Sequence, residues 1–289
     1  MKQILNILLL GSALLFVSCE ETHLPVDHTS LVVEGWIENG RPPVVILSRP
    51  VTITSDYQYY DNLSEYIIRW AKVSVVCEGD TVVLTGKFTP DYLPNYIYTT
   101  GRMMGEVGKT YTLIVEYGDQ YATAETTILP PPHVVDYEVC PKEGNDTLYQ
   151  INVQLSDIEP HRNYYQCFYK IGQYSKQYFT TYLGTFDDEV IDYEQPIPIF
   201  KGNNLFTEGD DYTPYFAKGD SVSVKISHID EGAYHFWDTY SQNVSLSYNM
   251  FLSNAKLMPT NVIGGSGFWC GMGSSSLNII IPTMSYKEE

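Results

Sequence analysis

The sequence predicts a mainly β protein with two β-sandwich-like domains, the first like an immunoglobulin or transthyretin domain. Short runs of alternating apolar and polar residues recur along most of the chain, and such alternation places apolar side chains on one face of a strand. Glycine-containing turn signals separate these runs. Three prolines at residues 130–132 divide the runs into two groups, because consecutive prolines lack amide hydrogens and cannot extend a sheet.

The first 18 residues have the features of a secretory signal peptide. Lys2 precedes an apolar run at residues 4–17, which is shorter than the ~20 residues needed to span a bilayer as a helix. The sequence FVSC at residues 16–19 resembles a bacterial lipobox, with Phe16 in place of the usual leucine. We expect cleavage before Cys19 and acylation of that cysteine, with simple secretion as the alternative.

Residues 19–29 are predicted to form a polar tether, and residues 30–129 the first domain. A two-residue turn at Gly79-Asp80 is expected to join two strands, and Gly118-Asp119 to join two more. About seven strands in some 100 residues are typical of an immunoglobulin-like or transthyretin-like sandwich. The expected strands lie in LVVEGWIE, PVVILS, KVSVVCEGDTVVL, YIYTT and YTLIVEYGDQYATAETT. The inward face of the first hairpin is predicted to hold Val73, Val75, Cys77, Val82 and Leu84.

Residues 130–132 are predicted to be a stiff linker, residues 133–283 the second β domain and residues 284–289 a tail. Residues 173–219 are predicted to form long loops, since they are rich in Tyr, Pro, Gly and acids with weak periodicity. One helix is expected near 230–247, where Asp230 is a suitable cap and apolar residues recur at helical spacing. The expected strands lie in LYQINVQLS, NYYQCFYKI, SVSVKIS and LNIIIP.

Charge and cysteine content restrict the possible functions. The formal net charge is −18, with 35 acidic and 17 basic residues, whereas binding to nucleic-acid phosphates needs a basic surface. The same charge keeps the body of the protein off anionic lipid and leaves Cys19 as the evident tether. The other cysteines, which contain no CxxC pair that would favour zinc, permit three disulfide pairings or free buried thiols. They are Cys77, Cys140, Cys167 and Cys270.

Catalytic and metal motifs are weak in this sequence, so we expect a protein that is not an enzyme and has no cofactor. Glu231, His235 and Asp238 share one face of the predicted helix and are weak metal-ligand candidates, with a solvated helix face as the favoured interpretation. His228 is expected at the rim of a core. The acidic segments 186–194 and 208–211 do not have calcium-loop spacing.

Other motifs also have ordinary explanations. The sequence contains no GxSxG nucleophile motif. GGSGFWCGMG at residues 264–273 does not match a phosphate-binding motif and is predicted to be a glycine loop that lets the backbone approach a neighbouring strand.

Tyrosine is unusually frequent, with 25 residues, many of them in predicted loops. A tyrosine ring with its hydroxyl group suits ligand recognition, so these loop tyrosines are candidate binding residues. They are Tyr57, Tyr59, Tyr60, Tyr178, Tyr182, Tyr193, Tyr212 and Tyr215. Thr81, Thr147 and Ser221 each follow an aspartate in a pattern that resembles the short O-glycosylation motif of Bacteroidetes extracytoplasmic proteins. Each also lies where a turn enters a strand, which alone favours these residue types.

Three segments together resemble a family of Bacteroidetes lipoproteins, the domain of unknown function 4249. They are LVVEGWIENG near the lipid cysteine, GKTYTLIVEYGDQYATAETTILPPP in the middle and NVIGGSGFWCG before the last strand, and the resemblance extends from about Leu31 to Pro282. The resemblance implies a cell-envelope lipoprotein encoded near TonB-dependent outer-membrane receptors and supplies no catalytic residues. Glu20-Glu21 resemble the acidic signals that direct such lipoproteins to the outer face of the outer membrane.

The expected function is therefore that of a non-enzymatic outer-membrane lipoprotein. It is expected to face the cell exterior, with the periplasmic face as the alternative, and to serve a TonB-dependent nutrient uptake system as a binding or accessory component. Its expected partners are the membrane, through the lipid, and a TonB-dependent barrel, with a small molecule, peptide or glycan as ligand and no nucleic acid. An adhesive or structural surface protein is the alternative, and an envelope hydrolase a remote one.

Overall fold

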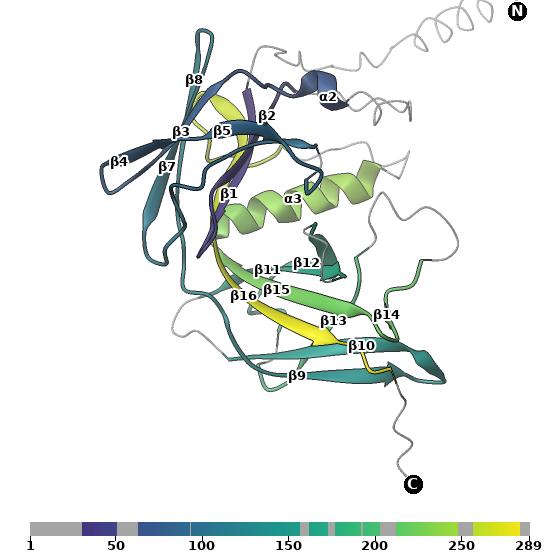
Figure 1. Ribbon diagram of the computed structural model, residues 1–289. Coiled ribbons are helices and arrows are strands. Elements are labelled where there is room, and N and C mark those ends of the chain that lie inside the picture. Colours follow the sequence, from purple (N-terminus) through teal and green to yellow (C-terminus); the bar gives the residue numbers. More distant parts are fainter. Residues whose placement is uncertain are drawn as a thin grey trace, which may run out of the picture.

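The computed structural model describes residues 31–50, 63–92, 94–156, 162–172, 177–191, 193–202, 212–247 and 257–283. Within these residues the protein is mainly β, as predicted (Figure 1). The predicted signal peptide, tether and tail lie outside them, as do Cys19, Tyr57, Tyr59 and Tyr60.

The strands of the first half are β1 Leu31–Glu38, β2 Val44–Ser48, β3 Lys72–Cys77, β4 Asp80–Val83, β5 Thr85–Phe88, β6 Tyr96–Thr99, β7 Thr110–Tyr117 and β8 Gln120–Thr127. Those of the second half are β9 His133–Lys142, β10 Asn145–Ser156, β11 Tyr164–Ile171, β12 Phe179–Asp187, β13 Ile197–Ile199, β14 Phe216–Ala217, β15 Ser221–Ile229 and β16 Gly265–Ile280. The helices are α2 Leu63–Tyr66 and α3 Glu231–Ser247.

One eight-stranded sheet extends through both halves of the molecule, in the order β12-β11-β15-β16-β1-β2-β6-β5. Its long strand β16 pairs in parallel with β1 from Gly265 to Met272 and antiparallel with β15 from Gly273 to Ile280. Figure 1 shows this strand, in yellow, running from beside β1 to the lower end of the molecule. The last strand of the sequence therefore joins the two halves.

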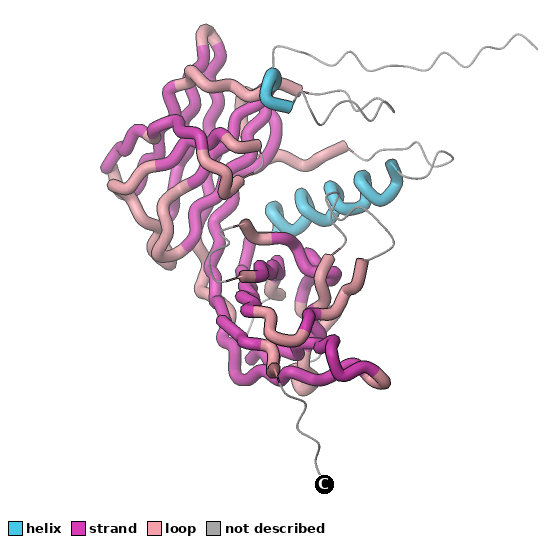
Figure 2. The backbone as a smooth tube through the Cα atoms, turned by 45° about the vertical axis from the view of Figure 1, so that its right-hand side comes forward, coloured by secondary structure: helices cyan, strands magenta, loops and turns pink. Residues whose placement is uncertain are grey.

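Two smaller sheets lie against one face of this shared sheet and make two hydrophobic cores. The sheet β4-β3-β7-β8 covers the first core, and β13-β10-β14, with β9 paired to β10, covers the second. Odd-numbered residues of β16 enter both cores, since Trp269 is buried in the first and Ile279 in the second. Figure 2 shows the two strand-rich parts with α3 beside them.

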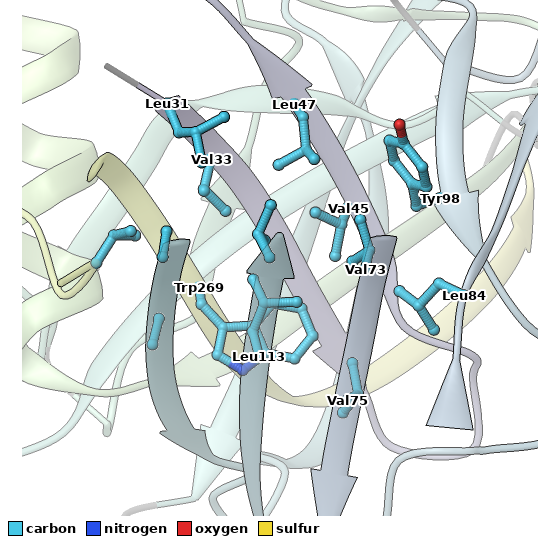
Figure 3. Packing of buried hydrophobic residues seen from close by; sticks show 14 of the residues in the cluster. Leu31, Val33, Val45, Leu47, Val73, Val75, Leu84, Tyr98, Leu113 and Trp269 are labelled. Carbon is cyan, nitrogen blue, oxygen red and sulfur yellow. The ribbon is translucent and has the colours of Figure 1, made fainter. Parts of the chain in front are cut away.

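The first core takes a central side chain from the far end of the sequence. Figure 3 shows Trp269 of β16 among residues from β1, β2, β3 and β7, and its indole nitrogen donates a hydrogen bond of 2.9 Å to the carbonyl oxygen of Tyr111. The boundary at residues 130–132 stays a prediction. The first core, whose other residues precede that boundary, also includes Val262 and Trp269, which follow it by more than 100 residues.

The predicted hairpins are present. In the first, the turn residues are Glu78 and Gly79, both with positive φ (50° and 89°), instead of Gly79-Asp80. The pairing moves by two residues, and because side chains alternate with a period of two, the predicted inward face is kept. Its fully buried members are Val73, Val75 and Leu84, and Cys77 packs against them in part. The second hairpin turns at Gly118-Asp119 as predicted.

Two loop predictions are wrong. Residues 265–273, predicted as a glycine loop, are the first half of β16. Their glycines do permit close backbone approach, because a Cβ at Gly267 would lie 1.9 Å from the carbonyl oxygen of Val33. Residues 173–219 contain β12, β13 and β14, of which the last two have three and two residues and are too short to show alternation.

Candidate ligand-binding site

The shared sheet has a second face, turned away from both cores, which we call the outer face. A cavity of about 500 Å³ lies against it, within the 300–1,000 Å³ typical of small-molecule sites. Its wall is formed by residues of β1, β2, β11, β12, β15 and β16, by the loops at 41–42, 91–92 and 177–178, and by α3. We call this space the sheet cavity.

Strand alternation explains which residues reach the sheet cavity. In β1 the side chains of Leu31, Val33 and Ile37 enter the first core, so Glu34, Trp36 and Glu38 point to the outer face. In β11 and β15 the same alternation places Gln166, Phe168 and Lys225 on the outer face. Both halves of the molecule therefore contribute residues to the wall of one cavity.

A buried ion pair joins the two halves in this wall. The Nζ atom of Lys225 lies 3.0 Å from Oε2 of Glu38, and both side chains are less than a tenth exposed. The ammonium group also lies 4.9 Å from the ring centre of Phe168 and 4.6 Å from that of Tyr178, within cation–π distance. Glu38 has a second cationic neighbour, since Nε of Arg41 lies 3.4 Å from Oε1. The charge of Lys225 is thus compensated before any ligand arrives.

Aromatic side chains form much of the remaining wall. Trp36 and Tyr92 lie with ring centres 5.8 Å apart at one side. Tyr178 shares a hydrogen bond of 3.2 Å with Ser223 Oγ, which fixes the position of its ring. Phe179 and Trp237 complete the aromatic part of the lining.

Helix α3 holds Trp237 over the sheet. Asp230 caps the helix as predicted, because its Oδ1 accepts a hydrogen bond of 2.8 Å from the backbone amide of Ala233. Ala233 is fully buried in a small cluster with Phe268, Cys270 and Met272 of β16, which fixes the first turns on the outer face. One turn further on, Trp237 reaches the sheet cavity.

Three polar groups at the sheet cavity have no partner among the described residues. Oε1 of Gln166 and Nε1 of Trp237 are buried without a hydrogen bond. Glu34 makes no hydrogen bond or ion pair within the described part of the chain, and its strand neighbours are Ile46 and Phe268. Its side chain is exposed on the wall of the cavity, and desolvation by the protein atoms around it raises the pKa of the carboxyl group from 4.5 to about 7.

The metal candidates lie on the solvent side of α3. His235 Nε2 is 3.7 Å from Glu231 Oε1, and both side chains are more than half exposed. Asp238 accepts a hydrogen bond of 2.8 Å from Gln242. No group of three metal-ligating side chains occurs in the described ranges. In the acidic segment 186–194, Asp187 is paired with Arg162 at 2.6 Å, and the segment 208–211 lies outside the described residues.

The described loop tyrosines do not gather at one place. Tyr178 lines the sheet cavity, whereas Tyr182 is 77% exposed. Tyr193 shares a hydrogen bond with the buried Tyr165, at 3.1 Å. Tyr212 donates to the carbonyl oxygen of Lys201, and the ring of Tyr215 lies under the ammonium group of Lys142. Of the predicted binding residues with described positions, Tyr178 is the one in the cavity wall.

The remaining candidates lie elsewhere. Thr81 and Thr147 are exposed and Ser221 is half-buried. His228 is buried, its Nδ1 lies 2.8 Å from the carbonyl oxygen of Pro130, and burial lowers the pKa of its imidazole.

All four cysteines outside the signal region are free thiols, and burial raises the pKa of each, to about 12 for Cys167. A thiol with a raised pKa holds its proton more firmly and is a poor nucleophile.

Several residues that line the sheet cavity were not predicted from the sequence. The signal for Glu34, Trp36 and Glu38 was present, because a tryptophan between two glutamates on one strand face is neither a core face nor an ordinary solvated one. Lys225 gave no signal, since serines flank it on its strand face and suggest solvent. Its burial depends on β1, which is almost 190 residues away in sequence.

The described residues include no helix long and apolar enough to span a membrane. No curated protein matches the sequence. A family model described as "Domain of unknown function (DUF4249)" matches residues 19–277, which is most of the chain and confirms the resemblance drawn from its three segments. The chain belongs to the DUF4249 family.

Proposed function

We propose that this protein is a non-enzymatic, lipid-anchored binding protein of the outer membrane, and that the sheet cavity captures a small ligand for a TonB-dependent uptake system. The observation that carries the binding role is the cavity itself. It has aromatic walls, a compensated ion pair and three polar groups that have no partner in the described part of the chain. Such a mixture of apolar wall and a few converging polar groups is typical of small-molecule sites.

The anchor and the partner rest on the sequence and on the resemblance. FVSC at residues 16–19 supports acylation of Cys19, and Glu20-Glu21 support export to the outer face. A tether of residues 19–29 would leave the described body free to present its cavity beside a barrel. The TonB-dependent partner follows from what the resemblance implies for the family.

A thermal-shift screen of small metabolites tests the binding role. A ligand present at a concentration of about 100 times its Kd adds about 2.7 kcal/mol to the free energy of unfolding, which raises Tm by several degrees. At least one compound should stabilise the wild type and Trp70→Ala but not Trp237→Ala. Trp70 is the matched control, because it is 89% exposed and lies outside the sheet cavity. The binding role would be contradicted if no compound stabilised the wild type, or if every active compound stabilised the wild type and both variants equally.

Two experiments in cells test the location and the partner. Cys19→Ser should abolish acyl labelling and leave precursor or released protein, and unchanged membrane retention would refute the anchor. Mild solubilisation of outer membranes followed by pulldown should recover a barrel protein in stoichiometric amount. Recovery of the lipoprotein without such a barrel would refute the accessory role and leave the cavity result untouched.

A further inference from the structure

The charges around the sheet cavity do not balance. Three carboxylates, of Glu34, Glu38 and Asp91, face two cationic side chains, of Arg41 and Lys225, which leaves one net negative formal charge. Glu38 lies next to both cations, at 3.0 Å and 3.4 Å. Glu34 has no charge partner among the described residues.

Glu34 is exposed on the wall of the cavity, beside apolar side chains. Its nearest neighbours on adjacent strands are Ile46 and Phe268, and Trp36 is the next residue on the same strand face. A carboxylate that is partly desolvated by its neighbours and has no partner is less stable than in water, and a bound cation would offset this cost. The adjacent aromatic rings attract cations for an independent reason, because the face of an aromatic ring carries partial negative charge.

The two buried polar atoms define the rest of the ligand. Gln166 is 2% exposed, and its Oε1 atom can only accept a hydrogen bond. The Nε1–H group of Trp237 can only donate one. A ligand that satisfies both must bring an N–H or O–H donor and an oxygen or nitrogen acceptor into the same cavity.

We infer that the sheet cavity takes a small organic cation, a primary amine or guanidine that also carries a hydroxyl or carbonyl oxygen, with its charged group at Glu34. This inference rests on the proposed binding role and names the ligand class of the same site. A cationic N–H group satisfies the carboxylate of Glu34 or Oε1 of Gln166 and places positive charge among the aromatic rings. The ligand oxygen accepts the hydrogen bond from Trp237. A neutral glycan would leave Glu34 uncompensated, and an anion would be repelled by it.

Isothermal titration with two probes of the same shape tests the inference. Tyramine carries an ammonium group and a phenol hydroxyl, and 4-propylphenol has a methyl group where tyramine has its ammonium. At about pH 8, where Glu34 is ionised, wild-type protein should bind tyramine about tenfold or more tightly than 4-propylphenol. Glu34→Gln should reduce this preference to less than about threefold. Glu143→Gln, in the exposed turn between β9 and β10, should keep the wild-type preference.

The outcomes separate the ligand class from the binding role. Equal binding of both probes to the wild type, or a tyramine preference that survives Glu34→Gln, would overturn the inference and leave the binding role in place. If neither probe bound but a compound from the thermal-shift screen bound in a way that depends on Trp237, the inference would also be overturned and the binding role would stay. Failure of both probes together with an empty screen would overturn both. Comparison of two probes on the wild type needs no variant to fold.

Discussion

Lys225 is the residue whose position depends most on the whole fold. Its ammonium group is buried against Glu38 from a strand of the other half, and two aromatic rings surround it. Alternation along β15 places Lys225 on the opposite face from Val224 and Ile226, which lie in the second core. The residues that this face contacts depend on the pairing of β15 with β16 and of β16 with β1. The local sequence around Lys225 does not indicate either pairing.

Lys225→Met should lower the free energy of unfolding by about 3 kcal/mol, because it leaves the buried Glu38 with only the half-exposed Arg41 as a partner. Adding Glu38→Gln should recover much of the loss, since the uncompensated charge is then removed. Urea denaturation of the single and double variants measures both effects.

The matched control for Lys225 is Lys72→Met. Lys72 lies 2.8 Å from Glu116, but both side chains are about half exposed, so its loss should cost less than about 1 kcal/mol. Equal losses at the two lysines would show that the pair of Lys225 is not buried in solution.

The raised pKa of Glu34 predicts an unusual dependence of the free energy of unfolding on pH. The folded state raises the pKa of its carboxyl group from 4.5 to about 7. Between these values the folded state keeps a proton that the unfolded chain has lost, so this group contributes less stability as pH rises from about 4.5 to about 7. Glu34→Gln should therefore be more stable than the wild type at about pH 8 and equal to it at about pH 4.

Denaturation of wild type and Glu34→Gln across that range measures the effect of Glu34 alone. The other charged groups of the cavity, Glu38, Arg41, Asp91 and Lys225, are common to both proteins. Glu143→Gln, in an exposed turn, is the control substitution. A stability difference for Glu34→Gln that is constant with pH would contradict the raised pKa.

At the scale of elements, the long strand β16 shows why a correct physical argument led to a wrong assignment. Glycine at high density favours loops, yet here the glycines let the strand lie against other backbone segments. The predicted last strand, LNIIIP, begins at Leu277 and supplies the final residues of β16, which have ordinary strand character. The first half of β16 shows no alternation in sequence, because glycines fill the positions that face Thr127 and Leu129.

Gly267→Ala should destabilise the protein by about 3 kcal/mol or more. The added Cβ would lie 1.9 Å from the carbonyl oxygen of Val33, and Gly267 has a φ of 101°, which L residues rarely adopt. Gly101→Ala is the control and should be near neutral, because nothing lies within 4 Å of its Cβ position. Similar Tm values for both variants in a thermal melt would contradict the β1–β16 pairing.

At the scale of the whole molecule, the fold class, most strands and the capped helix could be predicted because each depends on local periodicity or local turn chemistry. The shared sheet could not, since it requires the last strand to lie between β15 and β1, which belong to different halves of the sequence. The candidate site lies across that junction. Its residues therefore share no local motif, and the tyrosine count indicated one of them, Tyr178.

The central claim is that the outer face of the shared sheet holds a ligand between the two halves. Hydrogen–deuterium exchange with and without saturating tyramine tests this claim most directly. The account predicts added protection in peptides that cover residues 34–46, 166–180 and the start of α3, and no change in β7–β8 or β9–β10 on the other side of the sheet. Protection confined to one half of the molecule, or located in β9–β10, would contradict it.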